Sequence, residues 1–81
     1  MDEKERRIEE IKKEVELLNI QMKSMRYDRY SKAEKLGYID KQISLWDEMK
    51  ELVGFMDKLK INGALLVLEG LRKTLLMGKK A

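Results

Sequence analysis

The chain has 81 residues, of which 41% are charged, with no proline and only five glycines. Long helices tolerate this composition, whereas a sheet-rich fold with many tight turns needs more turn residues. Cysteine and histidine are absent, which removes disulfides, thiolate metal sites, the usual zinc ligands and the usual proton shuttle at neutral pH. The sequence therefore predicts a single all-α domain over residues 1–81, with no cofactor and no metal.

The first predicted helix covers residues 2–36 and carries a regular apolar stripe. Asp2 is its expected N-cap, because a carboxylate there can accept a hydrogen bond from a free backbone N–H of the first turn. The stripe recurs at spacings of three and four residues, which is the a/d rhythm of a helix that packs its seam against another helix. Its members are Ile8, Ile11, Val15, Leu18, Met22 and Met25. Gly37 is expected to end the helix, since glycine adopts the left-handed C′ conformation at little cost.

Two further helices are predicted, over residues 40–60 and 64–77. Asn62-Gly63 separates them, and both of these residues tolerate the positive φ of a tight turn. Gly78 is expected to close the last helix. The sequence therefore predicts an antiparallel C-terminal hairpin, with the long N-terminal helix packed on it.

The last helix carries more apolar surface than a single hairpin can cover. Leu68, Leu71 and Leu75 share one face, while Leu66 and Leu76 lie off it. Together with the Ile8–Met25 stripe, the three residues of that face are the candidate interface of a dimer or higher oligomer. The excess apolar surface of the last helix favours self-association. The stripe can also pack on the other helices of its own chain, and the sequence leaves this choice open.

A row of basic residues follows the stripe and suggests a second kind of partner. Residues 23–41 carry six bases and three acids, and such a segment attracts polyanions. Five of the bases recur every third residue, with two tyrosines between them that can stack on nucleobases. The candidate nucleic-acid site therefore consists of Lys23, Arg26, Tyr27, Arg29, Tyr30, Lys32 and Lys35. Solvated surface is the ordinary alternative for such a row.

Catalysis has little support in the sequence. There is no nucleophile–base pair, no glycine-rich phosphate loop and no HExxH motif. The acid pairs Glu10/Glu14 and Glu48/Glu51 fall short of the ligand sets that build carboxylate metal sites in helical bundles. We therefore expect the chain to be no enzyme.

The charged N-terminus lacks the apolar run of a signal peptide, and the last helix is too short to span a bilayer. A cytoplasmic protein is expected. The predicted function is that of a small, self-associating helical protein-interaction protein, an adaptor or regulator whose partner is another protein. Nucleic-acid binding through the basic row is the alternative.

Overall fold

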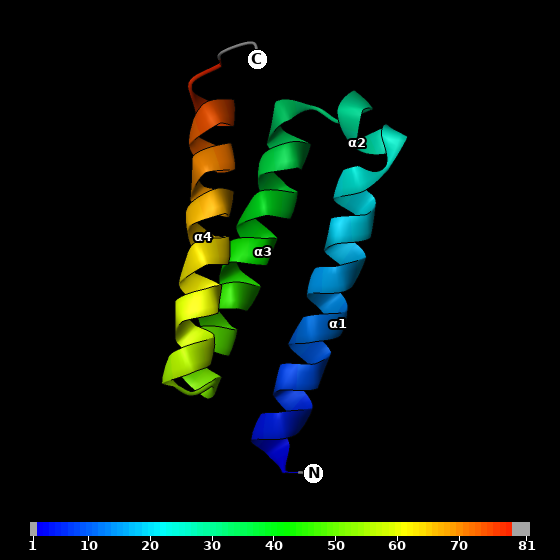
Figure 1. Cartoon of the computed structure of the whole chain (residues 1–81). Helices are drawn as coiled ribbons and strands as arrows, with labels where there is room; N and C mark the ends of the chain where they lie inside the picture. The colour runs from blue at the N-terminus through cyan, green and yellow to red at the C-terminus, as the bar shows by residue number, and fades with distance from the viewer. Residues whose placement is uncertain (1, 79–81) are drawn as a thin grey trace.

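The computed structural model describes residues 2–78, and within them the backbone but not the side chain of Met25. Four helices follow one another along the chain (Figure 1): α1 (Glu3–Lys23), α2 (Met25–Arg29), α3 (Lys32–Leu52) and α4 (Phe55–Leu76). No strand occurs between residues 2 and 78. The predicted fold is confirmed: it is all-α, with a long N-terminal helix packed on an antiparallel C-terminal hairpin.

The central helix is α3, which lies between α1 and α4 (Figure 1). One exposed ion pair ties each outer helix to it. The Arg7 guanidinium of α1 donates through Nη2 to Glu48 Oε1 at 2.7 Å, and this hydrogen bond holds the pKa of Glu48 below its ordinary value. Arg72 of α4 donates through Nε to Asp40 Oδ1 at 2.7 Å. Exposed pairs stabilise little, so they align the helices while apolar burial holds them together.

The core is an apolar cluster to which all three long helices contribute. Its buried members are Ile11, Val15 and Leu18 from α1, Leu45 and Met49 from α3, and Ile61 and Leu65 from α4. One polar side chain, Gln42 of α3, is also buried. Its Nε2 donates to Asn19 Oδ1 of α1 at 2.6 Å. Because a buried amide without a partner is costly, this bond favours one register of α1 along α3.

The prediction of one continuous helix over residues 2–36 is wrong, although its N-cap is confirmed. Asp2 Oδ1 accepts from the Glu5 N–H at 2.8 Å. The helix ends before Ser24, whose backbone is extended (ψ 155°) and whose hydroxyl donates to the Gln21 carbonyl at 2.7 Å. Serine hydroxyls compete in this way with the backbone bonds of a helix. The helix break folds the chain back, so α1 lies beside α3 instead of running on into it (Figure 1).

A capping box at Ser31 starts α3. The Ser31 hydroxyl accepts from the Glu34 N–H at 3.2 Å, and the Glu34 carboxylate accepts from the Ser31 N–H at 3.2 Å. These two bonds satisfy backbone N–H groups that have no partner within the helix, and they therefore favour a helix start at Ser31. The Ser-x-x-Glu spacing is visible in the sequence.

The predicted boundaries of the hairpin, residues 40–60 and 64–77, are also wrong. Gly37 lies inside α3 and Asn62-Gly63 inside α4. The chain turns instead at Val53 and Gly54, both with extended backbones. Glycine inside a helix costs about 1 kcal/mol relative to alanine, and burial of the apolar side chains that the longer helices carry into the core offsets this cost. The predicted closure of the last helix is confirmed, since Gly78 has φ 65°.

Ser31→Ala tests the capping box. Loss of the side-chain acceptor is expected to cost about 1 kcal/mol of unfolding free energy, which lowers the Tm of a domain of this size by roughly 4–8 °C. Ser44→Ala is the matched control, because Ser44 is an exposed residue inside the same helix where alanine is the better helix former. Thermal unfolding followed by circular dichroism measures both. Equal Tm values for the two variants would contradict the cap.

Candidate functional site

The Ile8–Met25 stripe is intramolecular for most of its length. Ile11, Val15 and Leu18 are buried in the core of the single chain, while Ile8 and Met22 are half-buried. The side chain of Met25 lies outside what the structure describes. In this conformation the buried part of the stripe is not available to a second chain.

The three predicted interface residues of α4 are spread between core and surface. Leu68 is buried, Leu75 is half-buried and Leu71 is 47% exposed. Leu71 is therefore the most accessible of the three to a partner, with about half of its surface exposed. The rest of this face belongs to the packing against α3.

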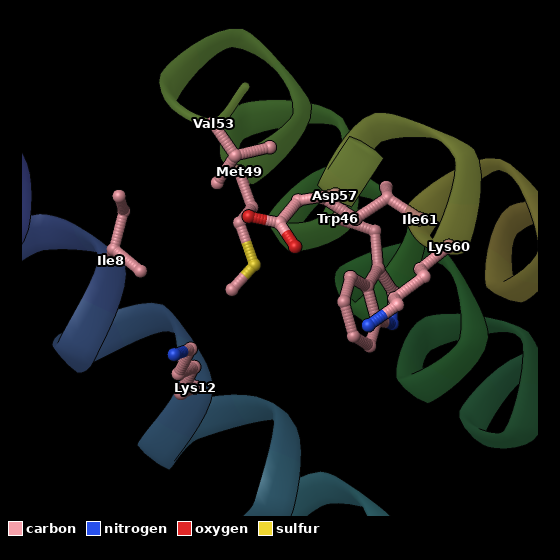
Figure 2. A pocket seen from close by; sticks show the side chains of 8 residues that line it. All are labelled: Ile8, Lys12, Trp46, Met49, Val53, Asp57, Lys60 and Ile61. Carbon is pink, nitrogen blue, oxygen red and sulfur yellow. The ribbon is translucent and has the colours of Figure 1, made fainter. Parts of the chain in front are cut away.

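A pocket opens where the N-terminal halves of α1 and α4 face each other beside the end of α3 (Figure 2). Its volume is about 440 Å³. Ile8 and Lys12 of α1 lie across the space from the other lining side chains (Figure 2). These are Trp46 and Met49 of α3, Val53 of the following turn, and Asp57, Lys60 and Ile61 of α4. The volume is in the range of ligand pockets, but the three charged residues are all exposed. No buried polar group of the lining orients a small molecule, so the pocket is suited to a bulky apolar side chain.

The basic row is distributed over three helices instead of winding around one. Lys23 ends α1, Arg26 and Arg29 belong to α2, and Lys32 and Lys35 begin α3. The first four are exposed and Lys35 is half-buried. The two helix breaks therefore divide the five bases among three helices at the end of the molecule where α2 lies (Figure 1). We call these five bases the basic corner.

The tyrosines of the basic row pack on one another and on a third tyrosine, Tyr38, which lies outside the predicted site. The rings of Tyr30 and Tyr38 stack with centroids 5.5 Å apart, and Tyr27 meets both edge-on. The pKa of Tyr38 is raised, mainly by a side-chain hydrogen bond with Tyr30 and to a smaller extent by burial. Burial also raises the pKa of Tyr27. The Lys35 ammonium lies 5.3 Å from the Tyr27 ring centroid. These contacts already occupy ring faces that stacking on bases would need.

The largest feature that the predicted site residues missed is the side of α4 that faces away from α3. We call it the outer face of α4. Phe55, Met56 and Leu66 are 71–73% exposed, and Leu59 and Val67 are more than half exposed. The signal in the sequence was the excess of apolar residues in the last helix. The predicted turn at Asn62-Gly63 divided this face between two helices, so the sequence did not indicate that it is continuous along one helix.

The described residues form no group of three or more carboxylates that could hold a metal ion. No helix between residues 2 and 78 is both long enough and apolar enough to cross a bilayer. No family model, curated protein or solved structure matches the chain. The functional inference therefore depends on the surfaces of the molecule.

Ile11→Ala tests the intramolecular assignment of the stripe. Ile11 has no exposed surface, so its truncation is expected to cost about 2–5 kcal/mol of unfolding free energy. The cost should not depend on protein concentration. Ile20→Ala, on the same helix at 60% exposure, is the control and should change the unfolding free energy by less than about 0.5 kcal/mol. Urea unfolding at two protein concentrations measures both; a cost for Ile11→Ala that appears only at high concentration would assign the stripe to an interface.

The nucleic-acid alternative makes a prediction of its own. Arg26→Glu with Arg29→Glu should abolish retention on single-stranded DNA, because both arginines are exposed at the basic corner. Arg6→Glu with Lys13→Glu is the control, with the same change in net charge at exposed positions of α1. If four bases contact phosphates, the logarithm of the affinity falls with that of the salt concentration with a slope of about −3. Absence of binding by the unmodified chain at low salt removes the alternative.

Proposed function

We propose that the chain is a non-catalytic helical protein-interaction protein, an adaptor or regulator that binds another protein through the outer face of α4. The observation that carries the proposal is where the exposed apolar side chains lie. Among the described residues, Leu17 and Ile20 are the large exposed apolar side chains of α1. On α4 and its C-cap they are Phe55, Met56, Leu59, Leu66, Val67, Leu71, Leu76 and Met77.

The amount of apolar surface on this one helix is unusual for a monomer. Leu71 and Leu76 lie toward α3 and border other pockets. From their exposed fractions, the other six residues leave on the order of 700 Å² in water, against about 300–600 Å² for the largest apolar patch of a typical monomer. Apolar area removed from water contributes roughly 25 cal/mol per Å² to association before the entropic costs are subtracted. A surface of this kind favours a macromolecular partner.

The form of the surface also favours a protein partner. The outer face is one side of a straight helix of 22 residues, and a partner helix can contact such a surface along its whole length. Methionines at two of its positions provide the adaptable contacts found on protein-binding surfaces. The pocket beside Trp46 adjoins the same helix through Asp57 and Lys60, so a partner that reaches around α4 can insert an apolar side chain there.

Site-specific photocrosslinking in cells tests the proposal. A benzophenone amino acid replaces Leu66, which is 71% exposed on α4, or Leu17, which is 61% exposed on α1. Both replacements keep an apolar side chain at an exposed position, so neither should unfold the chain. We expect covalent adducts with protein from position 66 that are several-fold stronger than those from position 17.

Adducts of equal strength at the two positions would contradict the proposal, because they would report random collision. Leu66→Glu, introduced while the benzophenone is placed at position 59, should remove the specific adducts by putting a charge into the apolar contact. Adduct mass on denaturing gels identifies whether the bound protein is another chain of the same kind or a different one.

A further inference from the structure

We infer that the outer face of α4 binds the same face of a second copy of this chain, with the two α4 helices antiparallel. The inference rests on the proposed function, since it names the partner of the same surface. Seven residues form the line along which the two helices would touch, and we call them the contact strip. They are Met56, Leu59, Gly63, Leu66, Gly70, Lys73 and Met77, all of them exposed.

The contact strip has the spacing of a helix–helix seam. Its members alternate at steps of three and four residues through three heptads, which keeps them on one side of a helix that packs lengthwise on another. One heptad position holds methionine, glycine, glycine and methionine, and the other holds two leucines and a lysine. The buried residues of α4, which are Ile61, Leu65 and Leu68, lie on the opposite side. The helix therefore has one seam for α3 and a second seam that no described helix covers.

The two glycines have no role inside the single chain that the structure reveals. A Cβ atom added at Gly63 or Gly70 would meet nothing within 4 Å, and neither residue has a positive φ. Each costs about 1 kcal/mol relative to alanine in a helix interior. Glycine in an apolar strip leaves a hollow that can hold a large side chain of a neighbouring helix. It also allows the backbone of that helix to approach closely.

An antiparallel pairing matches every hollow of the contact strip with a leucine. In antiparallel helices the two heptad positions face each other, so Gly63 meets Leu66 of the second copy and Gly70 meets its Leu59. The same two contacts recur by symmetry, as an isologous interface requires. A parallel pairing would set glycine against glycine and leave the hollows empty, which forfeits dispersion contacts.

Charge favours the same orientation. Parallel helices would place Lys73 directly against Lys73 of the second copy, inside the apolar contact. In the antiparallel register Lys73 meets Met56 instead, and the two lysines are separated by 17 residues, roughly 25 Å along the axis. Glu69 then lies beside Asn62 of the second copy at the border of the strip, where the amide can donate to the carboxylate.

The available area is sufficient for a stable pair. The apolar surface of the outer face, on the order of 700 Å² per chain, is comparable to the ~800 Å² that each partner contributes to a standard interface. Polar side chains such as Lys60 and Glu69 lie beside the strip, as in the polar rim around an apolar interface centre.

The first experiment measures the mass of the full chain by sedimentation equilibrium up to about 100 μM, a concentration that detects even a micromolar interface. We expect twice the 9.6 kDa of one chain. Leu66→Glu should raise the dimer Kd at least about 100-fold, since each dimer contains the change twice and must bury both charges. Leu17→Glu, an exposed apolar residue of α1, is the matched control and should leave the dimer intact. Circular dichroism verifies that both variants remain folded.

The second experiment reports orientation and uses the absence of native cysteine. A chain with Met56→Cys is mixed with a chain of different mass that carries Lys73→Cys, and the mixture is oxidised. The antiparallel register brings these two positions together, so the mixed disulfide should exceed both homodisulfides several-fold. A chain with Leu17→Cys in place of either partner should form little mixed disulfide.

Three results would overturn the inference: a monomer at 100 μM, a dimer that Leu66→Glu leaves unchanged, or a dominant homodisulfide of Lys73→Cys. A monomer that still gives Leu66 photoadducts with a different protein would leave the proposed function standing and refute only the second copy. A monomer without specific adducts would refute both.

Discussion

The structure depends on one constraint, which is that α3 supplies the packing surface for both of the other long helices. α1 and α4 lie along different sides of it, each joined to it by an ion pair at the surface. Apolar side chains from all three helices meet in a single cluster. A helix of about 10 Å diameter can cover only one side of its neighbour, so each outer helix keeps a side that faces water. On α1 that side is mostly charged, whereas on α4 it is apolar.

The polar contact inside this packing specifies alignment more than it adds stability. The Gln42–Asn19 hydrogen bond replaces bonds to water and contributes little net free energy. Sliding α1 along α3 would leave the buried Gln42 amide without a partner, which costs considerably more. The apolar stripe alone repeats every seven residues and tolerates a shift of one heptad. Only one of these registers satisfies Gln42, as a polar residue in a coiled-coil seam selects one pairing.

The fold class, the stripe and both chain-end caps could be predicted because they depend on local patterns. Composition excluded a sheet, the spacing of Ile11, Val15 and Leu18 gave one buried side of α1, and Asp2 and Gly78 had the residue types that their cap geometries need. The helix boundaries could not be predicted from glycine alone. Gly37 and Gly63 permit a turn without requiring one, and tertiary burial over two helices of more than 20 residues outweighed their helix cost.

The start of α3 was visible and was missed. Ser31 and Glu34 have the capping-box spacing, but the predicted helix was continued through them to Gly37, the first residue expected to end it. A capping box identifies a helix start from residues within one turn, whereas a glycine only permits a helix end. The stripe was assigned to an interface for a related reason. Periodicity identifies the buried side of a helix but does not say whether the same chain or another one covers it.

α4 departs from the usual division of a surface helix into an apolar and a polar side. Lys60 and Glu69 lie between two apolar sides, whereas Arg72 pairs with Asp40 of α3 and Lys73 lies within the contact strip. If the outer face served only solubility, a charge at the position of Leu66 or an alanine at Gly63 would be the better residue, the first for solvation and the second for helix stability. The exposed leucine therefore lowers the solubility of the isolated chain, and the glycine lowers the stability of its helix. An additional contact along the outer face, in which Gly63 admits a large side chain and Leu66 is buried, accounts for the two residues together.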